Sequence, residues 1–118
     1  MEKSKKIING YICVMEEIIT EFIIKNDEKN LCEKSKKVLS ESFELMKLEI
    51  ESLKKNESIT QENVVNLENL VINFHNNFCL LCVYFNGLSQ TQANMEFEKI
   101  LLNFNNDKEL LKAFLKEL

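Results

Sequence analysis

The sequence predicts an all-α protein: a four-helix bundle-like domain with a short fifth helix at its C-terminus. Two observations predict it. The chain has no proline and only two glycines, so the residues that usually turn a chain between short strands are nearly absent. Large apolar side chains recur instead at alternating steps of three and four residues, as in a helix with one buried face. A length of 118 residues fits one domain, 1–118, with its own core.

The first helix is predicted over residues 5–25. Asn26 or Asp27 can cap the second, which is predicted to run to about Lys55. The first has a broad apolar arc, which indicates packing against at least two neighbouring helices. Cys13 falls on its polar face and is expected to be exposed or to lie at a subunit contact. The buried stripes are expected at Ile8, Tyr11, Met15, Ile18 and Phe22 in the first helix, and at Leu31, Cys32, Ser35, Leu39, Ser42, Phe43, Met46, Ile50 and Leu53 in the second.

The third helix has the clearest helical pattern. Ser58 and Gln61 have the spacing of a capping box, which places its start between Ser58 and Thr60. Gly87 can adopt the left-handed conformation that ends many helices, so the end is expected near Asn86. Between these limits a strict alternation of three and four steps joins the apolar residues Val64, Leu67, Val71, Phe74, Phe78, Leu81 and Phe85.

A second capping box, starting at Ser89, predicts a fourth helix that continues to about Asn103. The run Asn105-Asn106-Asp107 consists of residues that favour turns and caps, so it is expected to break this helix and start a short fifth one. The apolar positions are expected at Met95, Phe97, Ile100, Leu101 and Phe104 in the fourth helix and at Leu110, Leu111, Phe114, Leu115 and Leu118 in the fifth.

Composition and charge exclude several functions. Every basic residue is lysine and the net charge is -4, whereas recognition of phosphate and guanine relies chiefly on the arginine fork. The densest apolar run, 78–85, is far shorter than the roughly 20 residues that cross a bilayer. No small-residue cleavage site follows the N-terminal apolar residues. We therefore expect a soluble, cytoplasmic protein with reduced cysteines that binds neither nucleic acid nor membrane.

One group of residues has the spacing of metal ligands. His75, Cys79 and Cys82 stand at i, i+4 and i+7 and share one side of the third helix, and Cys32 could complete a thiolate and imidazole site for Cu(I) or Zn(II). Reduced cysteines in an apolar run are also ordinary core residues. We prefer the core interpretation, with no cofactor, and keep the metal site as an alternative.

The sequence favours binding over catalysis. With one histidine and no Gly-rich phosphate loop, nothing indicates an activated nucleophile, and we expect no enzymatic activity. The acidic balance predicts a non-catalytic protein-binding module, a small regulator or inhibitor of the antitoxin, immunity or anti-defence type. A homodimer and a small-molecule sponge or sensor with an apolar pocket at the third helix remain alternatives. The candidate partner-binding residues are Glu16, Glu17, Glu41, Glu44, Glu51, Leu80 and Tyr84.

Overall fold

The computed structural model describes residues 2–25, 33, 36–82 and 90–118. These ranges are helical apart from a turn at 55–60 and the last residue, and no strand occurs in them, so the all-α prediction is confirmed. The elements are α1 (Glu2–Lys25), the short π-helix η1 (Val38–Ser42), α3 (Phe43–Lys54), α4 (Gln61–Cys82) and α5 (Gln90–Glu117).

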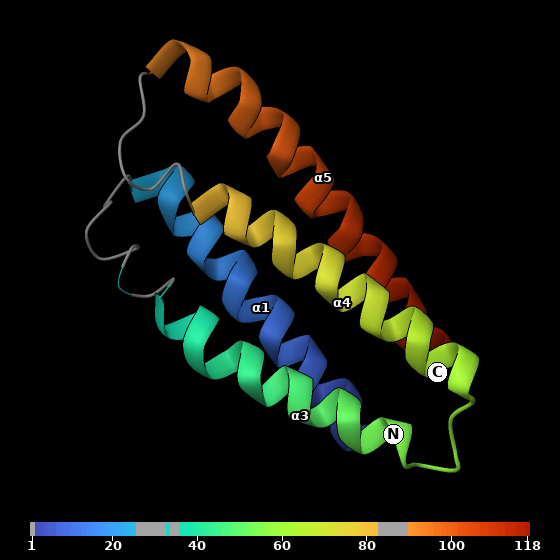
Figure 1. The fold of residues 1–118 in the computed structure, drawn as a ribbon. Coiled ribbons are helices and arrows are strands. Elements are labelled where there is room, and N and C mark those ends of the chain that lie inside the picture. Colours follow the sequence, from blue (N-terminus) through green and yellow to red (C-terminus); the bar gives the residue numbers. More distant parts are fainter. Residues whose placement is uncertain (1, 26–32, 34–35, 83–89) are drawn as a thin grey trace.

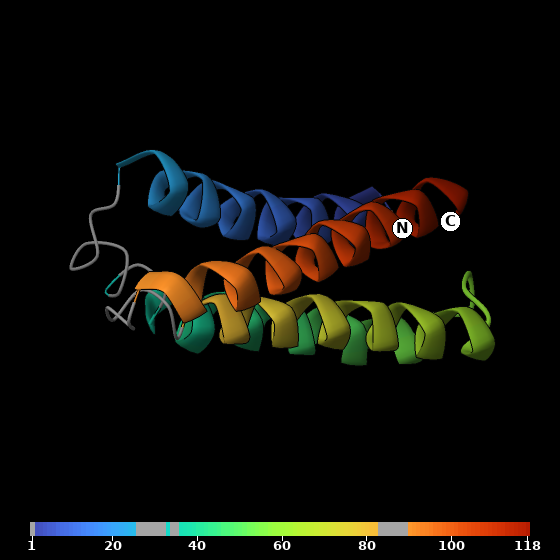
Figure 2. The same cartoon turned by 90° about the horizontal axis from the view of Figure 1, so that it is seen from above.

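The helices form an elongated four-helix bundle with extents of 49 × 24 × 17 Å. Helices that follow one another along the chain run in opposite directions, and both termini lie at the end where α3 connects to α4 (Figure 1). Figure 2 shows α1 above α3 and α4, with α5 rising from the level of α4 at its start to that of α1 at its end. The helix pairs in closest contact are α1 with α3, α3 with α4, α4 with α5, and α5 with α1.

The core contains most of the residues that the apolar periodicity predicts. Every described member of the α4 seam is buried, and Phe85 lies outside the described residues. Every described member of the α1 seam is buried as well, whereas Phe43 of α3 is half-buried. The prediction is wrong for Met95 and Leu110 of α5, which are exposed. The buried seam residues are Ile8, Tyr11, Met15 and Ile18 on α1, Met46, Ile50 and Leu53 on α3, Val64, Leu67, Val71, Phe74, Phe78 and Leu81 on α4, and Phe104, Leu111 and Leu115 on α5.

The ends of the helices differ from the prediction in detail. The expected start of the second helix, near Asp27, lies outside the described residues, as do Leu31, Cys32 and Ser35. Thr60 rather than Ser58 caps α4, because the Thr60 Oγ1 accepts a hydrogen bond from the backbone N–H of Asn63 at 3.2 Å. Ser58 instead donates to the Asn56 side chain, so the predicted capping box does not form.

The predicted break at Asn105-Asn106-Asp107 is wrong, because α5 continues through these residues to Glu117. Asp107 accepts a hydrogen bond from the Asn77 amide of α4, and Asn105 Oδ1 accepts one from Lys108 Nζ at 3.3 Å. Side chains bonded in this way no longer compete for the helix backbone. The residues expected to form a short terminal helix are the last turns of α5, packed through Leu111.

Candidate functional site

Two of the predicted partner-binding carboxylates, Glu17 of α1 and Glu41 of η1, lie in one surface groove. The groove has a volume of about 410 Å³. We call it the acidic groove, because three carboxylates and one lysine line it. Its lining residues are Val14, Glu17, Ile18, Glu21, Lys37, Glu41 and Ser42.

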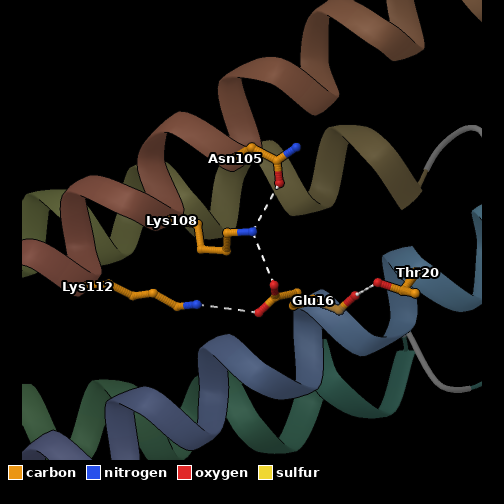
Figure 3. A network of polar contacts seen from close by, with 5 residues as sticks. All are labelled: Glu16, Thr20, Asn105, Lys108 and Lys112. Atoms are coloured by element: carbon orange, nitrogen blue, oxygen red, sulfur yellow. Dashed lines mark hydrogen bonds and ion pairs between the residues drawn. The ribbon is translucent and has the colours of Figure 1, made fainter.

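Glu16, by contrast, joins α1 to α5 (Figure 3). Its carboxylate accepts a hydrogen bond from Lys108 Nζ at 3.1 Å, and Lys112 Nζ lies 3.6 Å from its other oxygen. Thr20 Oγ1 donates to the Glu16 carbonyl oxygen at 2.8 Å. Partial burial alone would raise the pKa of Glu16, but the two ammonium groups outweigh this effect and hold the pKa below its usual value. We therefore assign Glu16 to the polar contact between α1 and α5.

Glu44 and Glu51 stand on the outer side of α3, and each pairs with a lysine three residues further along. Lys47 Nζ lies 2.9 Å from Glu44, and Lys54 Nζ lies 2.8 Å from Glu51. The hydrogen bond and charge of Lys54 lower the pKa of Glu51. We call Glu44, Lys47, Glu51 and Lys54 the charged stripe, since it carries both signs equally.

A second groove, the apolar groove, runs between α3 and α4 beside the charged stripe. Its volume is about 430 Å³. At the edge of this groove, Lys47 Nζ lies 5.0 Å from the centroid of the Phe43 ring. Lys54 also reaches across to Glu68 of α4 at 3.0 Å. The lining residues are Phe43, Lys47, Ile50, Glu51, Glu68, Val71 and Ile72.

His75 lies beneath the apolar groove and is only 8% exposed. The Phe43 ring stacks on it with centroids 3.6 Å apart and planes within 6°. Its Nδ1 lies 2.6 Å from Tyr11 Oη, and its Nε2 lies 3.4 Å from Cys79 Sγ. Burial lowers the pKa of His75, and the ammonium of Lys47 lowers it further.

The proton positions around His75 follow from these environments. Burial raises the pKa of Tyr11 far above its ordinary value, so the Tyr11 hydroxyl keeps its proton and donates it to Nδ1. The single N–H proton of the neutral imidazole ring is then on Nε2, where it faces the Cys79 sulfur. Burial also raises the pKa of the Cys79 thiol. The three groups form a neutral hydrogen-bonded chain, which is a structural arrangement rather than an activated nucleophile.

The metal-ligand group expected from the sequence comes together only in part. His75 and Cys79 are in contact, Cys82 is half-buried at the end of α4, and Cys32 lies outside the described residues. Within the described ranges, no three His, Cys, Asp or Glu side chains lie close enough together to hold a metal ion. The metal site stays an alternative prediction, because Cys32 lies outside the described residues.

One predicted partner-binding residue on α4 lies apart from both grooves. Leu80 is exposed on α4 but lines neither groove. Tyr84 lies outside the described residues. Cys13 is exposed on α1, as its position on the polar face predicts.

Comparison with known proteins gives no family for the chain. No protein-family model matches it, and no curated protein or solved structure matches it significantly. Of the helices in the described ranges, none combines the length and the apolar character needed to span a membrane.

The ion pairs within α3 and the contact between Tyr11 and His75 were not predicted from the sequence. The first had a local signal, the recurrence of glutamate three residues before lysine. The second had none, because its partners are 64 residues apart in the chain.

Proposed function

We propose that this chain is a non-catalytic protein-binding module, a small cytoplasmic regulator or inhibitor that docks its acidic groove onto a basic surface of a protein partner. The observation that carries the proposal is the convergence of Glu17 and Glu41, from separate helical elements, on one groove. Carboxylates grouped in a concave surface create a negative potential that attracts basic partners and orients their approach.

An exposed apolar side chain in the acidic groove supports the proposal. Val14 lines the groove and is 39% exposed. Specific protein interfaces combine a desolvated apolar centre with a charged rim. Val14 would supply apolar contact, and the glutamates would select a basic partner.

The position of the only histidine also favours binding over catalysis. His75 is buried, stacked on Phe43 and hydrogen-bonded to Tyr11. A general base needs to reach the proton that it removes, and His75 lines neither groove. A regulator that occupies a basic site on its partner needs complementary shape and charge alone.

The proposal is tested by affinity capture from extracts of the native host with three forms of the protein. The double variant Glu17→Lys/Glu41→Lys reverses the charge of the acidic groove. The double variant Glu98→Lys/Glu109→Lys makes the same change in net charge at two exposed positions of α5. Quantitative mass spectrometry should find a protein that is retained by the wild type and by the α5 variant and lost from the groove variant.

Salt provides a second criterion in the same experiment. Retention of that partner should weaken as ionic strength rises, because attraction between surface charges is screened within a Debye length of about 8 Å at physiological salt. Identical sets of proteins captured by all three forms would refute the assignment of binding to the acidic groove.

A further inference from the structure

The charged stripe of α3 has a symmetry that the proposed function does not use. Glu44, Lys47, Glu51 and Lys54 follow one another at steps of three, four and three along the same side of the helix. If the helix is turned end for end about Glu49, Glu44 and Lys54 exchange places. Lys47 and Glu51 also exchange places. Every glutamate then takes the place of a lysine, so the stripe is complementary to its own reversed copy.

The ion pairs of the stripe leave donors for such a copy. The Lys54 ammonium has three protons, of which two point to Glu51 and Glu68 at 2.8 and 3.0 Å. Lys47 contacts a single carboxylate, that of Glu44, among the ion pairs of the described residues. The side chains of Lys47 and Lys54 are 54% and 37% exposed, so a second molecule can reach both.

Exposed apolar surface lies on both sides of the charged stripe. Leu48 is 66% exposed and stands next to the midpoint of the stripe. The apolar groove borders the other side, and Ile72 at its edge is exposed. In a contact with twofold symmetry, residues near the axis meet their own counterparts. Leu48 would therefore face the second copy's Leu48 at the centre.

We propose that a second copy of this chain docks on the α3–α4 face, with the two α3 helices antiparallel and each charged stripe against the other. In this arrangement Glu44 meets the second copy's Lys54, and Lys47 meets the second copy's Glu51. Antiparallel helices paired by opposite charges are a known basis of partner choice and orientation in helical assemblies.

The size of the face predicts a weak dimer. The 12 residues of α3 span about 18 Å, so the contact lies at the small end of the range for specific interfaces. The dimer should therefore dissociate on dilution, and high salt should weaken it. The acidic groove involves η1 and α1 and contains no member of the charged stripe. The dimer rests on other residues than the proposed function, so the two can be tested separately.

Charge exchange between two variants tests the dimer. Lys47→Glu/Lys54→Glu makes the stripe entirely acidic, and Glu44→Lys/Glu51→Lys makes it entirely basic. Light scattering after gel filtration gives the mass of each form from about 5 to about 500 μM, a range that covers micromolar dissociation constants. Circular dichroism checks that each variant remains helical.

The wild type should rise with concentration from its chain mass of 13.9 kDa toward twice that mass. Each charge variant should stay monomeric, whereas an equimolar mixture of the two should recover the dimer. Glu98→Lys/Glu109→Lys, which makes the same type of change as the basic variant but on α5, should dimerise like the wild type. Leu48→Glu should weaken the dimer at least tenfold.

Three results would overturn the proposal. The first is a wild type that remains monomeric over the whole range. The second is dimerisation of both charge variants as strongly as the wild type, which would place the interface elsewhere. The third is a mixture of the variants that stays monomeric although each is folded.

Discussion

The hydroxyl of Tyr11 lies 2.6 Å from Nδ1 of His75 and joins α1 to α4 across the middle of the bundle. This contact is diagonal, since the closely packed neighbours of α1 are α3 and α5. Each neighbouring pair of helices also shares a polar contact of its own. These contacts are Ser4 with Glu49, Lys54 with Glu68, Asn77 with Asp107, and Glu16 with Lys108. Polar contacts at every interface favour one arrangement of the helices, because a rearranged bundle would leave these groups without partners.

Removing the Tyr11 hydroxyl should destabilise the fold. Tyr11→Phe keeps the ring but leaves Nδ1 of a buried histidine without a donor, which costs about 1–3 kcal/mol. Urea unfolding followed by circular dichroism measures the loss. The double variant Tyr11→Phe/His75→Leu removes both polar groups and should cost less than the sum of the single variants. Additive losses would show that the two side chains are not coupled.

Stability should fall on mild acidification because of His75. The fold lowers the pKa of His75, so below the unfolded value of about 6.5 the unfolded chain binds the proton more readily. The free energy of unfolding should be nearly constant above pH 6.5 and decrease as pH falls from 6.5 toward the folded pKa. Urea titrations between about pH 7.5 and 5 measure this decrease, in a range that avoids most carboxylate titration. His75→Gln should flatten the curve, and an unchanged slope in that variant would assign the effect to another group.

The two lysines that hold Glu16 should contribute unequally. The Lys108 side chain is 13% exposed and approaches to 3.1 Å, whereas that of Lys112 is 36% exposed and lies at 3.6 Å. Because Glu16 is itself more than one third exposed, solvent screening limits either coupling to about 1 kcal/mol or less. Double-mutant cycles that combine Glu16→Gln with Lys108→Met or Lys112→Met should give the larger coupling for Lys108. Equal couplings would contradict the geometry of this network.

Replacing Gly10 by alanine should stabilise the protein. Gly10 lies inside α1, and a Cβ added to it would meet no atom within 4 Å. Alanine is favoured over glycine in a helix interior by roughly 0.5–1 kcal/mol, and the open space adds no steric cost. Thermal unfolding should show a rise of a few degrees in Tm. A fall in Tm would mean that the helix at Gly10 is not regular.

The sequence predicted the parts of the fold that burial alone determines. The α4 seam from Val64 to Leu81 was visible because a helix with one buried face imposes its own period on the apolar residues. The break expected at Asn105-Asn106-Asp107 failed because the local preference of these residues yields to tertiary contacts, such as that between Asp107 and Asn77. A local pattern could not show that partner, which is 30 residues away.

The candidate site was predicted residue by residue but not as an assembly. Their charge and their position on the polar faces of helices identified Glu17 and Glu41 separately. The fold of the bundle places both in one groove. The same reasoning also selected Glu16, whose partner Lys108 is 92 residues away along the chain. The helical pattern identifies which carboxylates lie on the polar face of a helix. It does not identify which of them form an ion pair with a neighbouring helix.

Calorimetric titration of the captured, purified partner measures whether the acidic groove binds a basic protein. Glu17→Lys/Glu41→Lys should raise the Kd at low salt by about tenfold or more, equivalent to about 1.4 kcal/mol, while Glu98→Lys/Glu109→Lys should leave it within about twofold. Equal affinities for the wild type and the groove variant, with both proteins folded, would show that the acidic groove is not the binding site.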